Sequence, residues 1–322
     1  MSVVELVDSA MDRTVVPGYS KMGLVVRRRL AGWQADLPRM DGKVVVVTGA
    51  ASGIGLAATL GFAELGATVL GVVRSDTRAR ELEAEAARSF GAAAASVRTA
   101  VCDVSSLSSI REFARQLGER YDHIDVLVNN AGVMPPQRQV TADGVELAFA
   151  THVLGPYVLI NELTELLSAS SPGRVINVTS GGMYVQHLAS ADLQTERCEY
   201  GPTKVYARSK RAQVILTEEM ADRLGGRGIA VHSMHPGWLD TPGVQGWMPL
   251  FLTLTRPIIR TPAQGADTIL WLGATDPATT STGKLWQDRH QRPTHYRRRT
   301  RETPAERREL MDTLEALAGP AN

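Results

Sequence analysis

Cysteine is scarce in this chain, and neither sign of charge is in excess. Only Cys102 and Cys198 occur among 322 residues, too few for a disulfide framework or a cysteine-based zinc site in a chain of this length. This favours a reducing compartment, and we expect a cytoplasmic protein. The 35 basic and 34 acidic residues nearly cancel, so no overall field would attract nucleic acid. We expect no nucleic-acid partner and no metal ion.

Long apolar runs are also missing. No segment approaches the roughly 18 consecutive apolar residues of a membrane-spanning helix, and residues 1–10 lack the basic-then-apolar order of a secretory signal. We expect no transmembrane segment. Residues 1–40 contain three arginines at 27–29 and Trp33, and this N-terminal arm either packs on the domain or makes a peripheral contact with a membrane or a partner. Packing is favoured, because a single basic run is usually a solvated face.

Short runs rich in valine and isoleucine alternate with helix-like stretches. Six runs occur, at residues 43–47, 67–73, 96–101, 125–128, 174–178 and 229–233, and a seventh short strand is expected at 284–286, after a helix that starts near Thr261 and Pro262. Their near-continuous apolar character indicates strands covered on both faces, with the helices as right-handed crossovers. The sequence thus predicts an α/β fold, a doubly wound (Rossmann), mostly parallel seven-stranded sheet with helices on both faces, in one domain at residues 41–290. A C-terminal basic segment and helix at 291–322 follows.

A glycine-rich turn follows the first predicted strand. Gly49 permits a tight turn, Gly53 lets the backbone approach a pyrophosphate, and Gly55 lets helix and strand pack closely. Amides at a helix start bind anions, so we expect Ser52 and Ile54 to contact a dinucleotide together with these glycines. An ordinary strand-to-helix turn is the alternative, but the position after the first strand favours dinucleotide binding.

The end of the second strand indicates which dinucleotide binds. A ribose with free hydroxyls is normally held there by an acidic side chain, whereas this chain has Val73 followed by Arg74. A guanidinium can bind a 2′-phosphate through two parallel hydrogen bonds. NADP(H) is therefore favoured over NAD(H), with Arg78 as a further candidate contact. In the alternative interpretation Arg74 is solvated and Asp76 turns inward.

Two further strand ends are candidates for the same ligand. Asp103, with Val104 beside it, follows the third strand, where it would accept a hydrogen bond from an adenine amino group. An aspartate at that place is also a common helix cap. The fourth strand ends in Asn-Asn-Ala-Gly, in which Asn130, Ala131 and Gly132 let the backbone lie against the ribose. A plain turn is the alternative, since Asn and Gly are turn formers.

Groups suited to proton transfer lie further along the chain. Tyr206 and Lys210 are four residues apart, so on a helix they share one face. A free tyrosine has a pKa of about 10, and a nearby cation lowers it by stabilising the phenolate. Ser180 ends the fifth strand, at the edge where ligands of open parallel sheets bind, and would hold a substrate oxygen. A chance pair and a capping serine are the alternatives, but together with the glycine turn these residues favour an enzyme.

Over residues 41–290 the chain resembles the short-chain dehydrogenase/reductase family. The resemblance rests on five ordered motifs, which are Thr-Gly-x-x-x-Gly-Ile-Gly at 48–55, Asn-Asn-Ala-Gly at 129–132, Ser180, Tyr-x-x-x-Lys at 206–210 and Pro236-Gly237. It implies an NAD(P)-dependent oxidoreductase that acts on a small-molecule carbonyl or alcohol and assembles as a homodimer or tetramer.

The resemblance also implies residue roles. Tyr206 would be the proton donor and acceptor, Lys210 would bind the nicotinamide ribose and lower the tyrosine pKa, and Ser180 would polarise the carbonyl. The nicotinamide end of the cofactor would contact Pro236, Gly237 and Thr241.

One position departs from the family pattern. The family usually has Asn where this chain has His152, and that Asn holds a water that links the lysine to solvent. Histidine also donates and accepts hydrogen bonds, so we expect a catalytic part for His152 and reduced but real turnover. A protonated imidazole beside Lys210 would place two positive charges together and alter the pH optimum. The departure also leaves open a different class, a dinucleotide-sensing binding protein that lacks the chemistry.

The segment 237–260 is expected to form a mobile apolar lid over the substrate. It contains Trp238, Trp247, Met248, Phe251 and Leu252. These side chains favour a lipophilic substrate such as a steroid, a retinoid, a lipid aldehyde or a xenobiotic ketone, unless they merely pack on the domain.

Overall fold

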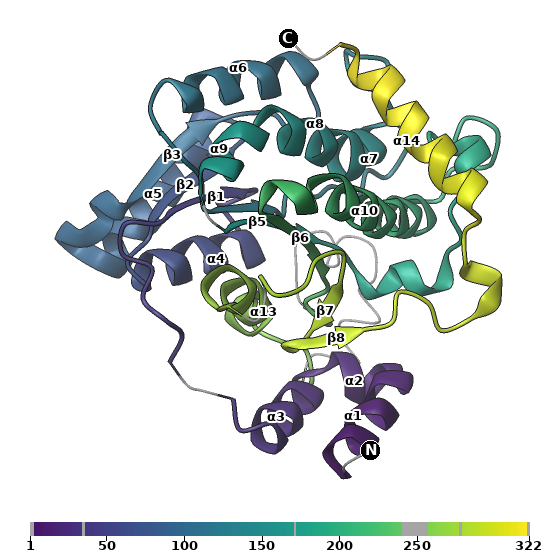
Figure 1. Ribbon diagram of the computed structural model, residues 1–322, viewed down its shortest axis with the longest axis horizontal. Helices are drawn as coiled ribbons and strands as arrows, with labels where there is room; N and C mark the ends of the chain where they lie inside the picture. The colour runs from purple at the N-terminus through teal and green to yellow at the C-terminus, as the bar shows by residue number, and fades with distance from the viewer. Residues whose placement is uncertain (1–2, 34–35, 171, 240–256, 277–278, 321–322) are drawn as a thin grey trace.

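The centre of the molecule is one eight-stranded sheet in the order β3-β2-β1-β4-β5-β6-β7-β8 (Figure 1). The computed structural model describes residues 3–33, 36–170, 172–239, 257–276 and 279–320. The strands are β1 (Val44–Thr48), β2 (Thr68–Val73), β3 (Val97–Val101), β4 (Val126–Asn129), β5 (Gly173–Val178), β6 (Ile229–Met234), β7 (Leu285–Gln287) and β8 (His290–Arg292). The first seven pair in parallel. The predicted doubly wound α/β architecture is confirmed.

The eighth strand is an addition to the predicted seven. β8 consists of His-Gln-Arg and runs antiparallel to β7, without the valine and isoleucine that mark most of the other strands. A two-residue turn folds it back onto β7. Asp288 and Arg289 in that turn have positive φ values of 52° and 57°, the backbone twist that favours tight hairpins. Polar contacts of both residues hold this conformation, which is otherwise unfavourable away from glycine.

Helices cover both faces of the sheet (Figure 1). One face carries α4 (Gly53–Glu64), α5 (Asp76–Phe90) and α13 (Pro262–Ala274), and the other carries α6 (Leu107–Gly118), α7 (Leu147–Phe149), α8 (Gly155–Glu162), α9 (Thr164–Ala169), α10 (Pro202–Leu224) and α14 (Pro304–Ala318). The all-valine start of β1 fills both cores, because successive strand residues point to opposite faces. Val45 and Val47 belong to the core under α4 and α13. Val44 and Val46 belong to the core under α10.

The later helices begin at threonine caps. The Thr261 hydroxyl accepts a hydrogen bond from the Gln264 amide at 3.2 Å, and Pro262 occupies the first turn of α13, a pattern that favours a helix start. Thr303 caps α14 in the same way. The C-terminal helix then buries Leu310 and Leu314 in the core beside α10, so the end of the chain is part of the domain's packing.

The N-terminal arm forms three helices beside the β7–β8 edge of the sheet (Figure 1). These are α1 (Val3–Arg13), α2 (Val15–Tyr19) and α3 (Lys21–Leu30). The expectation that the basic run is a solvated face is wrong for Arg27, which is 2% exposed. Its guanidinium donates to Asp8 at 2.6 Å, to Asp288 at 2.6 Å and to the Gly18 carbonyl at 2.7 Å. Among the residues that the structure describes, no helix is both long and apolar enough to cross a membrane.

A buried network of opposite charges clamps this arm to the hairpin. Arg260 donates to the two carboxylate oxygens of Asp288 at 2.6 and 2.8 Å, and Arg292 donates to Asp8 at 2.6 Å. Burial opposes ionisation of Asp288, but the guanidinium groups of Arg260 and Arg27 outweigh it and lower the pKa of that carboxyl. Buried charges are tolerated when they are paired in this way, so the arm and the hairpin depend on each other.

Candidate active site

Three glycines determine the shape of the turn between β1 and α4. Gly49 and Gly53 have φ values of 67° and 56°, which side chains rarely adopt. A Cβ at Gly55 would lie 2.2 Å from the Gly49 carbonyl oxygen, so only glycine allows this approach. Ser52, at the N-cap of α4, forms no side-chain cap. The first amides of the helix, including that of Ile54, therefore face the turn as anion donors, and the site fits a pyrophosphate.

The Asn-Asn-Ala-Gly loop is bonded to this turn. The Asn130 side chain donates to the Thr48 carbonyl at 2.9 Å. The Thr48 hydroxyl in turn accepts from the amides of Asn130 and Ala131 at 2.9 and 3.0 Å. A Cβ at Gly132 would lie 3.3 Å from the His152 ring. The loop is thus held against the turn that is predicted to bind a dinucleotide, and Asn130 contributes by fixing the backbone.

Arg74 follows β2 and is exposed. Within the described chain it forms no ion pair with a carboxylate. Ser75 caps α5, and Asp76 lies exposed in the first turn of that helix, so the aspartate does not turn inward. Arg78 pairs with Glu81 at 2.7 Å. Arg74 is therefore the guanidinium at this strand end that remains available to a ligand phosphate.

Asp103 follows β3 and organises its own loop. Its Oδ1 accepts from the amide and hydroxyl of Ser105 at 2.9 and 2.7 Å, while Ser106 is the residue that caps α6. Val104 is buried, and its carbonyl oxygen lies 2.1 Å from where a Cβ at Gly155 would be. Asp103 remains exposed at the sheet edge, as the predicted adenine contact requires.

Ser180, Tyr206 and Lys210 converge at the carboxyl edge of β5. Tyr206 and Lys210 are one turn apart on α10, with the Lys210 ammonium 5.8 Å from the centre of the tyrosine ring. Burial raises the pKa of Tyr206, and a hydrogen bond with the Ser180 hydroxyl opposes that rise. The Ser180 oxygen also accepts from the Gly182 amide at 3.4 Å. The structure therefore brings together the hydroxyl, the phenol and the amine that the sequence predicts as one site.

Lys210 has a further partner that the sequence analysis missed. Its ammonium donates to the Val178 carbonyl at 2.8 Å and to Gln213 Oε1 at 3.1 Å. Burial lowers the pKa of Lys210 to about 7, because the charged form loses hydration. The available signal was the i,i+3 spacing of Lys210 and Gln213, which places them on one side of a helix. Gln213 helps to determine where the ammonium lies.

His152 lies in a π-helical turn, Ala150–Leu154, that precedes α8. Its Nε2 accepts from the Val133 amide at 3.0 Å, so the ring proton is on Nδ1 and is donated to Ser209 Oγ at 2.7 Å. Ser209 then donates to the Tyr206 carbonyl at 2.8 Å. Burial, and then the charge of Lys210, hold the pKa of His152 well below its usual value. The imidazole is neutral, which contradicts the hypothesis of two adjacent positive charges.

Pro236 and Gly237 follow β6 and support the loop that leads to the predicted lid. Gly237 has a φ of 82° and a Cβ there would lie 2.6 Å from the Arg260 guanidinium. Arg260 also donates to the Pro236 carbonyl at 3.1 Å. Thr241 and most of the predicted lid, including Trp247, Met248, Phe251 and Leu252, lie outside the described residues.

A cavity of about 1020 Å³ lies beside the segment 180–185, which we call the serine loop. It is bounded by the N-terminal arm and by the segment after β8. Its walls include Tyr19, Tyr184, Trp238 and Tyr296 together with Gly181 and Gly182, whereas Ser180, Tyr206 and Lys210 are not among the lining residues. Tyr19 packs close to Gly181, the residue after Ser180, where a Cβ would lie 2.9 Å from the ring. Tyr19 and Tyr296 were not predicted from the sequence, because they lie outside residues 41–290, where the family resemblance ends. Aromatic residues are only 5% of the chain, so their presence in both flanks was the available signal.

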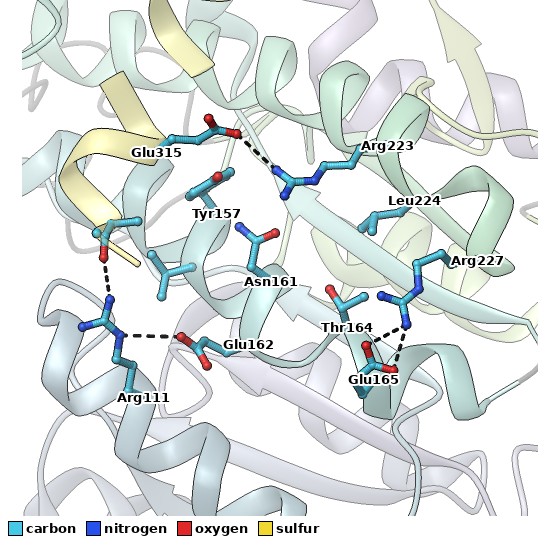
Figure 2. Close-up of a pocket in the computed structure, with 13 residues that line it drawn as sticks. Arg111, Tyr157, Asn161, Glu162, Thr164, Glu165, Arg223, Leu224, Arg227 and Glu315 are labelled. Atoms are coloured by element: carbon cyan, nitrogen blue, oxygen red, sulfur yellow. Dashed lines mark hydrogen bonds and ion pairs between the residues drawn. The ribbon is translucent and has the colours of Figure 1, made fainter. Parts of the chain in front are cut away.

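A second cavity, of about 510 Å³, lies between α8, the end of α10 and α14 (Figure 2). Three ion pairs surround it, namely Arg111 with Glu162 at 3.6 Å, Arg223 with Glu315 at 3.5 Å and Arg227 with Glu165 at 2.8 Å. Each arginine has its own carboxylate, so this cavity offers no excess charge to a ligand. The residues predicted for the active site are not among those that line it.

The sequence matches the family model for short chain dehydrogenases over residues 43–249. It is 42% identical over 282 residues to dehydrogenase/reductase SDR family member 12 from Bos taurus, covering 87% of each chain. It is 35% identical over 254 residues to retinol dehydrogenase 11 from Homo sapiens, covering 78% of this chain and 79% of that protein.

A solved structure with the same fold contains a reduced dinucleotide. It is a blue fluorescent protein from a metagenomic library in complex with NADPH, and it superposes with a TM-score of 0.61 at 27% sequence identity. The match covers 76% of this chain and 95% of that one.

Proposed function

The chain belongs to the short-chain dehydrogenase/reductase family, and from that premise we propose that it is an NADP(H)-dependent oxidoreductase of lipophilic carbonyls or alcohols. Membership makes it an enzyme that acts on CH–OH groups with a nicotinamide dinucleotide. The observation that carries the proposal is the convergence of Ser180, Tyr206 and Lys210 at the carboxyl edge of the sheet whose first strand leads into the glycine turn. The proposed substrates are steroids, retinoids, lipid aldehydes and xenobiotic ketones.

Preference for NADP(H) is supported by the strand end after β2. Arg74 is exposed there and Asp76 faces away into the first turn of α5, so no carboxylate repels a 2′-phosphate. A guanidinium binds phosphate through charge-assisted hydrogen bonds. The structural neighbour with bound NADPH agrees with this choice, whereas NAD(H) remains the alternative that the cofactor titration below tests.

A lipophilic substrate is supported by the cavity beside the serine loop. Three tyrosines and Trp238 are among its walls, and aromatic faces bind apolar and polycyclic ligands through large contact areas. A volume of about 1020 Å³ suits a substrate of steroid or retinoid size. The name of the relative retinol dehydrogenase 11 points to the same chemical class.

In the proposed mechanism Tyr206 moves the proton and Ser180 orients the substrate oxygen. A bound nicotinamide dinucleotide supplies or accepts the hydride. During reduction the Tyr206 hydroxyl donates its proton to the carbonyl oxygen, while the Ser180 hydroxyl stabilises the negative charge that develops there. During oxidation Tyr206 accepts the proton instead. In its protonated form Lys210, held by Val178 and Gln213, supplies a positive charge that favours the phenolate.

Two properties outside the site remain predictions. Family resemblance implies a homodimer or homotetramer, which light scattering of the purified chain would measure. The small number of cysteines agrees with a reducing compartment such as the cytoplasm, which fractionation of cells that express the chain would measure.

The test is NADPH consumption with a panel of steroid ketones, retinal, lipid aldehydes and xenobiotic ketones. We expect turnover of at least one lipophilic carbonyl by the wild-type chain. Tyr206→Phe should lower kcat/KM by about 100-fold or more while NADPH binding persists, because the ring is retained and only the proton-transfer group is lost. If the wild-type chain binds NADPH and turns over none of the panel, the protein is a dinucleotide-binding protein instead.

A further inference from the structure

Exposed apolar side chains gather on the N-terminal arm. Five of the nine large hydrophobic residues that are exposed in the described chain lie between residues 7 and 30. Four of them are on α3, where Met22 is 59% exposed, Val25 37%, Val26 36% and Leu30 42%. We call these four residues the α3 stripe. Scattered exposed valines are ordinary, but a cluster on one helix marks an interaction surface.

The α3 stripe is fixed outward by the packing of the opposite side of the helix. Positions 22, 25, 26 and 30 share one face at helical spacing, whereas Gly23, Leu24 and Arg27 are buried. A Cβ at Gly23 would lie 2.2 Å from the Pro17 carbonyl oxygen, so α3 is in close contact with α2. With Arg27 bonded to Asp8 and Asp288, α3 cannot rotate to bury its apolar face.

Basic residues accompany the stripe, and the nearby carboxylates do not pair with them. Lys21, Arg28 and Arg29 are exposed, and within the described chain none of them forms an ion pair. No Asp or Glu occurs between residues 13 and 35, and the nearby carboxylates of Asp8 and Asp288 are already paired with Arg27. The outward face of α3 therefore combines exposed apolar area with uncompensated positive charge.

We propose that the α3 stripe docks the protein on an anionic lipid bilayer. A short amphipathic helix lies in the plane of the interface with its apolar side chains among the acyl chains, while lysine and arginine engage the headgroups. Each basic residue near an anionic surface adds attraction. A second copy of the chain fits this face less well, because a symmetric contact would set the three positive charges against their own copies.

Docking would bring the cavity close to the lipid. The inner side of the same arm supplies Asp8, Asp12 and Tyr19 to the cavity wall, and the buried network joins the arm to the hairpin at β7–β8. A lipophilic substrate dissolved in the bilayer would then reach the cavity without crossing water. This last link rests on the proposed function, whereas docking itself does not.

Vesicle sedimentation of the full chain tests the proposal. We expect binding to phosphatidylcholine vesicles that contain phosphatidylserine, weaker binding to phosphatidylcholine alone, and loss of binding as salt is raised. The variant Met22→Ser/Val26→Ser/Leu30→Gln should reduce binding roughly tenfold or more. Arg28→Gln/Arg29→Gln should reduce it by roughly fivefold for each charge removed.

The matched control is Arg298→Gln/Arg299→Gln, which removes two exposed arginines from the C-terminal segment and should leave binding unchanged. An equal loss in that control, or no sedimentation with either vesicle, would overturn the proposal. So would concentration-dependent dimerisation that disappears with the apolar variant, because a second copy would then cover the stripe.

NADPH consumption with a water-soluble ketone should be the same in the wild-type chain and in all three variants. Absence of turnover in every one of them would count against the proposed oxidoreductase and leave the docking result standing. Loss of sedimentation would thus contradict membrane docking, and loss of turnover would contradict the proposed oxidoreductase, each without affecting the other.

Discussion

The Nδ1 atom of His152 lies 2.7 Å from the hydroxyl oxygen of Ser209, and this contact ties the π-helical turn before α8 to the helix that carries Tyr206. Because the Val133 amide donates to Nε2, both ring nitrogens are engaged within the fold. Neither nitrogen is left to bond a water that leads to Lys210. The position of the predicted departure from the family pattern therefore holds a neutral imidazole that links the loop after β4 to α10.

Acidification should weaken the fold through this imidazole. An unfolded histidine titrates near 6.5, whereas burial and Lys210 keep the pKa of native His152 well below that value. Below about pH 6.5 the unfolded chain binds a proton that the native chain excludes, so the free energy of unfolding falls by up to about 1.4 kcal/mol per pH unit. Urea denaturation between about pH 7.5 and 5.5 measures this slope.

His152→Asn should show a shallower pH dependence of the free energy of unfolding than the wild-type chain. The exposed His187 supplies the control, since His187→Asn should keep the wild-type slope. Identical slopes in all three proteins would remove His152 as the source of the effect.

Substitutions at Gln213 should move the titration of Lys210 in opposite directions. Gln213→Leu removes an acceptor from the ammonium and should shift the Lys210 limb of the kcat/KM pH profile to lower pH. Gln213→Glu places a carboxylate there and should shift the same limb to higher pH. Shifts of the same sign in both variants would show that Gln213 acts only through packing.

Arg74→Ala should weaken binding of NADPH selectively. Loss of charge-assisted hydrogen bonds to the 2′-phosphate costs about 1.5–3 kcal/mol, or roughly 10- to 100-fold in affinity, while NADH affinity should change little. Fluorescence titration of both nucleotides measures the two dissociation constants. Arg78→Ala is the control, because Arg78 is paired with Glu81 and its loss should matter less. Equal affinities of the wild-type chain for both nucleotides would remove the NADP(H) assignment.

Asp288→Asn should destabilise the protein strongly. The change leaves Arg27 and Arg260 buried without their shared carboxylate, and breaking a buried ion pair costs about 3–5 kcal/mol. Urea denaturation reports the loss, and proteolysis should cut the arm sooner. Asp41→Asn breaks an exposed pair with Arg39 and should cost less than about 1 kcal/mol. Equal losses of unfolding free energy in the two variants would mean that burial of the network does not increase its contribution to stability.

Much of the fold was predictable because its signals are local. The valine-rich strands and the glycine turn each follow from neighbouring residues, and so does the cap at Thr261. The predicted Tyr206, Lys210 and Ser180 meet because strand ends of a parallel sheet share one edge. Local patterns were sufficient wherever the partner of a residue was its neighbour in sequence or in the sheet.

The sequence could not predict contacts between residues that are far apart in the chain. Burial of Arg27 depends on Asp288, which is 261 positions away, and β8 carries no apolar pattern of its own. The neutral state of His152 depends on a backbone amide at Val133, a donor that no side-chain motif records. Tyr19 joins the cavity only because the arm folds back across the sheet edge.

The pairing of both ends of the chain has a consequence for biosynthesis. Asp8 bonds Arg292 across 284 positions, and Arg27 bonds Asp288 across 261. During translation the first helices therefore emerge long before the residues that hold them exist. The arm must remain undocked on the nascent chain until residues 288–292 have left the ribosome, so its attachment follows synthesis of all eight strands.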